Sequence, residues 1–230
     1  MSVKRLLNLN LVLLLLVISS CQSIQYSKTS NRSLPELGTI GVFSDYLLEE
    51  VNHPKTVVQL STPIRLKISY VTFKKRTLFS KQDSIEIKQN RDSVLTSIEI
   101  KDFVTLLKQL NKNKEVLSYL KLSENNSIVT SVLVDLPEEI KSKIENSDES
   151  YLIQSKERTL SIELRRENEI FYQIEFSQMN IVDYDSHSFC WGVKSGYKVG
   201  IMDLVPKDVD CGNSTYKSAR KAERKSQIKF

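Results

Sequence analysis

Two strands and the turn between them decide the fold, and they lie in residues 160–176, which read LSIELRRENEIFYQIEF. Apolar residues recur at every second position on both sides of the turn, at Leu160, Ile162 and Leu164 and again at Ile170, Tyr172, Ile174 and Phe176. Both sets must face one core, because a one-residue slip in the pairing would send one set to solvent. A three-residue turn of Arg166, Glu167 and Asn168 meets this condition, since Asn tolerates a left-handed backbone at its third position. We therefore predict a hairpin in which Leu164 faces Ile170 and Ile162 faces Tyr172.

A second hairpin is predicted in residues 189–201, which read FCWGVKSGYKVGI. Residues 194–196 form its turn, with Gly196 at the third position, where glycine adopts a left-handed backbone without strain. This register sets Trp191 over Val199 and Phe189 over Ile201. The two predictions strengthen each other, because in both hairpins a three-residue turn puts the apolar sets of the two strands on one face.

The chain before the hairpins alternates between strand and helix patterns. Strict apolar alternation predicts strands at 64–70, around 85–87 and at 98–100, and Ser44 is a candidate cap for a short helix through Glu50. A helical stripe then begins after Asp102, with apolar residues at Phe103, Leu106, Leu107 and Leu110. A polar interruption at 111–114 precedes a further apolar stripe, which indicates either one kinked helix or two helices joined tightly.

Residues 128–134 are apolar on both faces, as expected for a central strand that is covered above and below. Pro137 suits the first turn of a following helix, whose buried side would carry Ile140 and Ile144. The next strand is expected at 151–155, and the connection is long enough for a parallel crossover. We predict an α+β fold, mainly antiparallel β-sheet with two or three helices packed on it and room for one parallel crossover.

Composition and charge narrow the class of protein. The chain has 230 residues, of which 40% are hydrophobic, with six Gly and five Pro, so collagen-like and disordered classes are excluded. Its net charge of +5 is too mild to indicate a nucleic-acid partner. Residues 217–230 carry six bases and one acid, a net charge of +5. This is the net charge of the whole chain, so the rest of the chain is close to neutral.

The first twenty residues have the pattern of a secretory signal. Lys4 and Arg5 precede an unbroken apolar run from Leu11 to Ile18, and two small residues follow the run. The run is too short for a permanent membrane span, which needs about 20 residues.

The residues at the end of this run, Ile18-Ser19-Ser20-Cys21, resemble the lipobox of bacterial lipoproteins. The resemblance covers only the leader. It implies that Cys21 receives a diacylglyceryl group, that cleavage occurs before Cys21, and that the new amino terminus is acylated, for example with palmitate. Stable membrane anchoring requires two or more acyl chains. Gln22 stands where Asp would retain a lipoprotein at the inner membrane, which favours the outer membrane. An ordinary cleaved signal is the alternative.

The other two cysteines, Cys190 and Cys211, form an even pair, and such a pair in an exported protein indicates a disulfide. In the predicted hairpin Cys190 lies opposite Gly200, whose missing side chain leaves room for Cys211. The alternative is a catalytic Cys190 with His187 as its base, which would require a depressed thiol pKa and an oriented base.

Few residues suggest a chemical site. The chain has two His and no GxGxxG, Walker, HExxH, GxSxG or CxxC motif. Asp183, Asp185 and His187 are spaced by two, so an extended segment would set these three metal-ligand types on one face. A polar loop leading into the strand at Phe189 is the interpretation we favour, with a divalent metal site as the alternative. We expect no cofactor.

The basic segment 217–230 has no apolar stripe, so it cannot insert deeply into a membrane. We interpret it as a solvated terminus, with binding to an anionic surface as the alternative.

These observations predict four parts: a signal peptide at 1–20, a flexible tether at 21–36, a single α+β domain at 37–216 and a basic tail at 217–230. We interpret the protein as a lipid-anchored envelope lipoprotein, held at the outer membrane and facing the periplasm. Its predicted role is non-catalytic binding of another envelope protein, as an assembly partner or as an immunity factor against a toxin. A lipid or small-ligand carrier and a metal-assisted hydrolase are the alternatives. Nucleic acid is excluded by the compartment.

Overall fold

The computed structural model describes residues 34–42, 52–55, 60–73, 93–156, 159–194, 198–212 and 214–227. They belong to one compact unit, which begins at Leu34. Several expectations lie outside the described residues. They are the signal peptide, Cys21, the tether up to residue 33, the short helix at 44–50 and the strand around 85–87.

The described chain is built on one antiparallel sheet with the strand order β10-β9-β5-β4-β3-β6-β7-β8, and β1 pairs with both β2 and β5. The strands are β1 (Ile40–Val42), β2 (Asn52–Lys55), β3 (Ile64–Phe73), β4 (Ser93–Ile100), β5 (Ser127–Asp135), β6 (Glu149–Lys156), β7 (Thr159–Arg166), β8 (Glu169–Glu175), β9 (Asn180–Val193) and β10 (Val199–Pro206). The helices are α2 (Phe103–Lys112), α3 (Lys114–Lys121), α4 (Glu138–Glu145) and α5 (Ala219–Gln227), with a short 3₁₀ turn at Phe176–Gln178. The α+β class with a mainly antiparallel sheet is confirmed.

Two finer expectations are wrong. The connection through α4 does not make a parallel crossover, because β6 pairs antiparallel with β3 and β7. The connection is long enough to pass β4 and β3, so it delivers β6 to the far side of β3 rather than beside β5. Four α-helices, rather than two or three, are present in the described part of the chain. One of the four is α5, which forms in the segment expected to be a solvated terminus.

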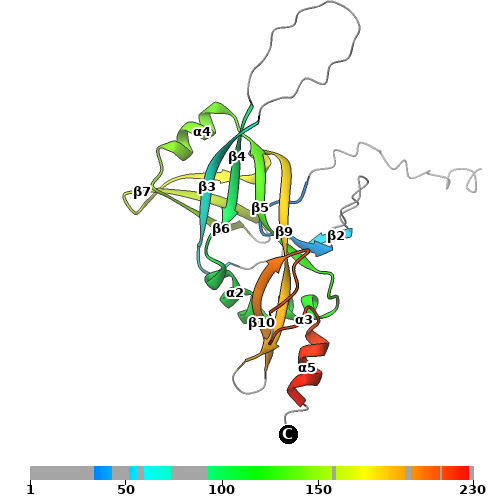
Figure 1. The fold of residues 1–230 in the computed structure, drawn as a ribbon. Helices are drawn as coiled ribbons and strands as arrows, with labels where there is room; N and C mark the ends of the chain where they lie inside the picture. Colours follow the sequence, from blue (N-terminus) through cyan, green and yellow to red (C-terminus); the bar gives the residue numbers. More distant parts are fainter. Residues whose placement is uncertain are drawn as a thin grey trace, which may run out of the picture. The chain divides into compact units, whose positions relative to one another are not determined.

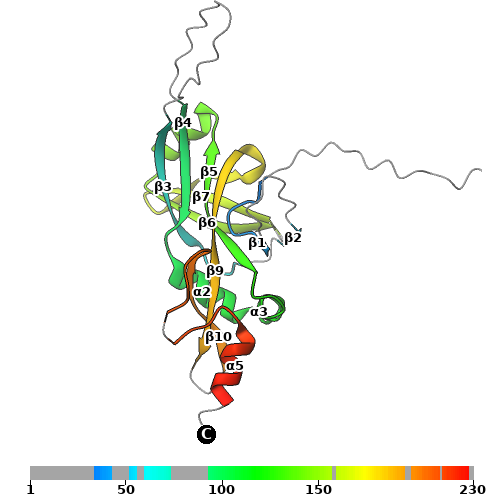
Figure 2. The same ribbon diagram turned by 45° about the vertical axis from the view of Figure 1, so that its right-hand side comes forward.

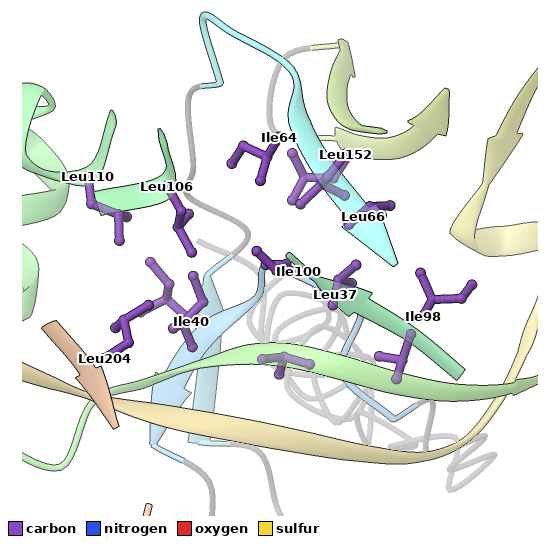
Figure 3. Packing of buried hydrophobic residues seen from close by; sticks show 14 of the residues in the cluster. Leu37, Ile40, Ile64, Leu66, Ile98, Ile100, Leu106, Leu110, Leu152 and Leu204 are labelled. Carbon is purple, nitrogen blue, oxygen red and sulfur yellow. The ribbon is translucent and has the colours of Figure 1, made fainter. Parts of the chain in front are cut away.

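The sheet bends at β3 into two layers. β3 pairs with β4 along most of its length but with β6 only at Ile64 and Arg65, so β6, β7 and β8 diverge and cross behind the first layer (Figure 1). The core fills the space between the layers. In Figure 3, Ile64 and Leu66 of β3 lie with Leu152 of β6 and Ile98 of β4, and all four are buried. Full burial of each such side chain stabilises the fold by about 1.5–3 kcal/mol.

The segment before β1 passes through this core. Leu37 is fully buried, and Gly38 has a positive φ of 83°. This φ favours glycine, and a Cβ atom at Gly38 would also lie 2.7 Å from a methyl carbon of the Leu160 side chain, which would have to shift.

Helices α2 and α3 begin as their sequence predicts. The side chain of Asp102 accepts a hydrogen bond from the backbone N–H of Thr105 at 2.9 Å and so caps α2. Asn113 ends α2 and caps α3, since its side chain accepts from the N–H groups of Glu115 and Val116. The structure therefore has two tightly joined helices. Leu106 and Leu110 of α2 point toward Ile40 in Figure 3.

The hairpin β7–β8 forms in a shifted register, and Ile170, which we predicted to face the core, is 67% exposed. Ile162 pairs with Ile174 and Leu164 with Tyr172, not with Tyr172 and Ile170 as predicted. The turn has two residues, Glu167 and Asn168, and both have positive φ, which is the primed turn that fits the twist of the strands. A bulge after Leu164 then restores the parity that puts Ile162 and Leu164 on one face with Ile174 and Tyr172.

The hairpin β9–β10 also differs in register from the prediction. Trp191 pairs with Ile201, and Phe189 pairs with Leu204 beyond a bulge between Ile201 and Asp203. Cys190 consequently lies opposite Asp203 rather than Gly200. The predicted disulfide is confirmed: Cys190 and Cys211 are bonded, with their Cα atoms 5.6 Å apart.

Candidate functional site

An open depression of about 770 Å³ lies along the first half of β9. Its floor and walls come from residues 182–187 of β9, Thr130 and Ser131 of β5, and Phe103 of α2. Leu34, residues 99–100 of β4 and residues 206–208 at the end of β10 also line it. Segments far apart in the sequence thus meet here, because β5 is the neighbour of β9 in the sheet.

The three residues predicted as metal-ligand candidates all line this depression. Asp183, Asp185 and His187 lie in β9, so the polar loop we favoured is instead part of a 14-residue strand. These polar residues are in a strand because their backbone groups pair with β5, and such pairing does not require apolar side chains. On β5 their partners are Leu133, Ser131 and Ile128.

This arrangement does not assemble a metal centre. Alternate residues of a strand are separated by about 6.5–7 Å along its axis, so Asp183 and His187, four residues apart in β9, lie too far from each other to bind one ion. Within the described part of the chain, no group of three His, Cys, Asp or Glu side chains converges closely enough to hold a metal ion. The side chain of Asp183 accepts a hydrogen bond from the backbone N–H of Tyr184.

His187 is the best-organised side chain of the depression. Its Nδ1 lies 2.6 Å from the hydroxyl of Thr130, and its ring centroid lies 5.5 Å from that of Phe103. Burial lowers the pKa of His187, while Asp185 and Asp203 oppose this effect. The imidazole is therefore neutral at neutral pH.

A bulge in β5 positions the hydrogen-bond partner of His187. Val129 pairs with Ser186 and Ser131 with Asp185, so Thr130 is an extra residue in β5 without a partner in β9. The hydroxyl of this buried threonine is directed to His187. Only one signal in the sequence could have indicated that Thr130 and Ser131 belong to a site. They are the two polar residues inside the apolar run 128–134.

The alternative of a Cys190 nucleophile is wrong for this structure. The sulfur of Cys190 is bonded to Cys211, so it has no thiolate to offer. Nδ1 of His187 contacts Thr130 instead.

The lining of the depression combines acidic and apolar side chains. Its carboxylates are Glu99, Asp183, Asp185 and Asp208, and the depression contains one lysine, Lys207. Glu99 also forms an exposed ion pair with Lys67 at 3.3 Å. Apolar surface comes from Leu34, Phe103, Pro206 and Val182, and Val182 is 40% exposed. Acidic groups around exposed apolar atoms form a surface that a partner with basic and apolar groups would complement.

A second exposed apolar surface lies on β8, at one end of the strand order. Ile170 is 67% exposed and Phe171 is 39% exposed. The strand begins and ends with a charged residue, Glu169 and Glu175. Charged side chains are common on edge strands, where they disfavour pairing with other chains.

Comparisons of the chain with protein-family models, curated proteins and solved structures gave no match. None of the helices in the described residues is long and apolar enough to cross a bilayer.

Proposed function

We propose that this protein is an exported bacterial lipoprotein, anchored through Cys21 at the outer membrane and facing the periplasm, and that its domain binds another protein without catalysis. The observation that carries the export is the disulfide between Cys190 and Cys211. Disulfides persist in oxidising compartments and are rare in the cytosol of mesophiles. The third cysteine, Cys21, ends the lipobox-like sequence and is left for the lipid.

The depression supports a binding role rather than a chemical one. Three groups that could act chemically near it have other partners: Cys190 is in the disulfide, Nδ1 of His187 contacts Thr130, and Asp183 accepts from the backbone of Tyr184. What is left for a partner is an open surface in which carboxylates surround exposed apolar atoms such as those of Val182. The partner that fits is a protein with a basic and apolar protrusion, either an assembly component or a toxin to be neutralised.

The lipid anchor is tested by mass spectrometry of the protein isolated from its own cells. The first residue of the processed chain should be Cys21 carrying a diacylglyceryl and an acyl group. The Cys21→Ser variant should lose this modification and leave the membrane fraction. An unmodified amino terminus at residue 21, or membrane retention of Cys21→Ser, would contradict the anchor.

The binding surface is tested with a photo-crosslinking amino acid at Val182. The matched control carries the same group at Ile170, which is also apolar and exposed but lies on β8. A partner of the depression should crosslink at 182 and not at 170. Asp185→Lys should abolish the crosslink, because it reverses a charge in the lining. Equal crosslinking at both positions would count against this surface.

A further inference from the structure

Helix α5 packs on the domain with small side chains and presents bases outward. Ala219, Ala222 and Ser226 are buried, and they lie on one side of the helix at the spacing of three and four residues. Small side chains allow the helix to lie close to β9 and β10, where Figures 1 and 2 both place it. The exposed side carries Arg220, Lys221, Arg224 and Lys225, which we call the basic face.

Three of the four bases of the basic face, Arg220, Arg224 and Lys225, form no ion pair that holds the described part of the fold together. Nearby acids are paired with other bases: Glu223 with Lys121 at 2.8 Å, and Asp210 with Lys217 at 3.2 Å. Lys221 lies 5.4 Å from the ring centroid of Tyr216.

The arrangement of these bases costs the helix stability. Arg220 and Arg224 are four residues apart, as are Lys221 and Lys225, and like charges at this spacing repel one another. An exposed helix face with four cations and no compensating acid therefore matches a negatively charged partner. The face has no apolar residues, so it suits contact with charged groups at a surface rather than insertion beneath them.

We propose that the basic face of α5 binds the anionic phospholipid headgroups of the membrane that holds the Cys21 anchor. The choice of a membrane rests on the lipid anchor in the proposed function. Only residues 22–33 separate Cys21 from Leu34, and a chain of this length spans at most about 40 Å. An anchor at Cys21 therefore limits how far Leu34 can lie from the headgroups, and a tethered domain makes a weak electrostatic contact at high effective concentration.

The experiment uses the chain from residue 21 to 230 with Cys21→Ser, so that no lipid contributes to binding. Its sedimentation is measured with vesicles of phosphatidylcholine and with vesicles that contain about 30% phosphatidylglycerol. We expect binding to the anionic vesicles only, and the bound fraction should fall when the salt rises from about 50 mM to about 200 mM, because salt screens exposed charges.

The decisive variant replaces Arg220, Lys221, Arg224 and Lys225 with Gln. The matched control replaces four exposed bases outside α5 that form no ion pair in the described part of the chain, Lys101, Lys108, Lys112 and Arg166, with Gln and so changes the net charge equally. Each base near an anionic surface strengthens binding about fivefold, so the α5 variant should bind at least about 100-fold more weakly. The control should keep most of its affinity. Circular dichroism and the Cys190–Cys211 disulfide should show that both variants are folded.

Three outcomes would overturn the proposal: equal binding to both vesicles, equal losses in the α5 variant and the control, or no binding to anionic vesicles at low salt. If the chain instead binds only a soluble polyanion, the basic face serves another partner and the proposal is also overturned. A failure of lipidation at Cys21 is detected separately by mass spectrometry, so the two proposals fail in distinguishable ways.

Discussion

The two halves of β9 have opposite surroundings, although they belong to one continuous strand. In the first half, Val182, Asp183 and Asp185 are exposed along the depression. In the second half, Phe189, Cys190 and Trp191 are buried. The comparison teaches that the candidate binding surface is the extension of a strand whose other end is fixed in the core, so its side chains are held on a rigid scaffold.

The second half of β9 is held by three independent connections. Cys190 is bonded to Cys211, Trp191 exchanges two backbone hydrogen bonds with Tyr216, and α5 packs against the strand. The first half is held mainly by its pairing with β5. Four changes test this difference, in order of decreasing effect, and a fifth sharpens the last of them.

Trp191→Ala should have the largest effect, a loss of about 3–5 kcal/mol in the free energy of unfolding, because it empties a large buried site. Val182→Ala in the first half should change the stability by less than about 0.5 kcal/mol, since Val182 is exposed. Urea unfolding followed by circular dichroism measures both. Similar losses in the two variants would show that the halves do not differ.

Replacing both Cys190 and Cys211 with Ser should lower the stability by about 3 kcal/mol, as expected for a ring closed over 21 residues of sequence separation. Unfolding of the unchanged chain in reducing buffer provides the matched measurement, because it removes the bond without changing the sequence. If neither treatment moves the unfolding midpoint, the disulfide does not contribute to holding β9.

Asn111→Ala should cost about 1–3 kcal/mol, because it leaves backbone groups of β10 without partners. The side chain of Asn111 donates to the carbonyl of Ile201 at 2.8 Å and accepts from its N–H at 2.9 Å. Asn146→Ala is the control, since the Asn146 side chain bonds only to exposed Ser142. Thermal unfolding of the two variants should separate them clearly.

His187 should give the smallest effect, a pH dependence of the free energy of unfolding that originates in the depression along β9. Burial lowers its pKa from the ordinary value of 6.5, so the unfolded chain binds a proton at higher pH than the folded chain does. The contribution of His187 to stability is complete above about pH 6.5 and falls as the solution becomes more acidic. Unfolding by urea at several pH values should show that His187→Gln removes this loss.

Asp185→Asn sharpens the test of His187. Asp185 raises the pKa of His187, so its neutralisation should lower that pKa further and make the loss of stability on acidification larger. A smaller loss in Asp185→Asn than in the unchanged chain would contradict the assigned electrostatics.

Local patterns predicted the elements better than they predicted the pairing. The helix that begins after Asp102 and the interruption at 111–114 depend on neighbouring residues, and the structure confirms both. Alternation in the hairpins determines which face is buried, but several registers keep that face. Bulges after Leu164 and Ile201 select among them, and no short pattern in the sequence shows where a bulge forms.

Long-range contacts explain what the sequence could not show at the candidate site and in α5. Asp183, Asp185 and His187 were identified because they are neighbours in sequence. Thr130 reaches His187 only through the pairing of β5 with β9 and a bulge in β5. Similarly, α5 resembles a solvated segment because its buried residues are small, and the surfaces of β9 and β10 that cover Ala219 and Ala222 come from other parts of the chain.

The bridge between Trp191 and Tyr216 has a further consequence for the protein's behaviour at high local concentration. Pairing of β5 with β9 ends at Ser188, so the backbone beyond it would present open hydrogen-bonding groups. Tyr216 occupies them at Trp191, with N–H to O=C distances of 2.7 and 2.8 Å. The segment around Tyr216 thereby prevents these backbone groups of β9 from pairing with a strand of another molecule. A chain truncated before Tyr216 should therefore be prone to self-association.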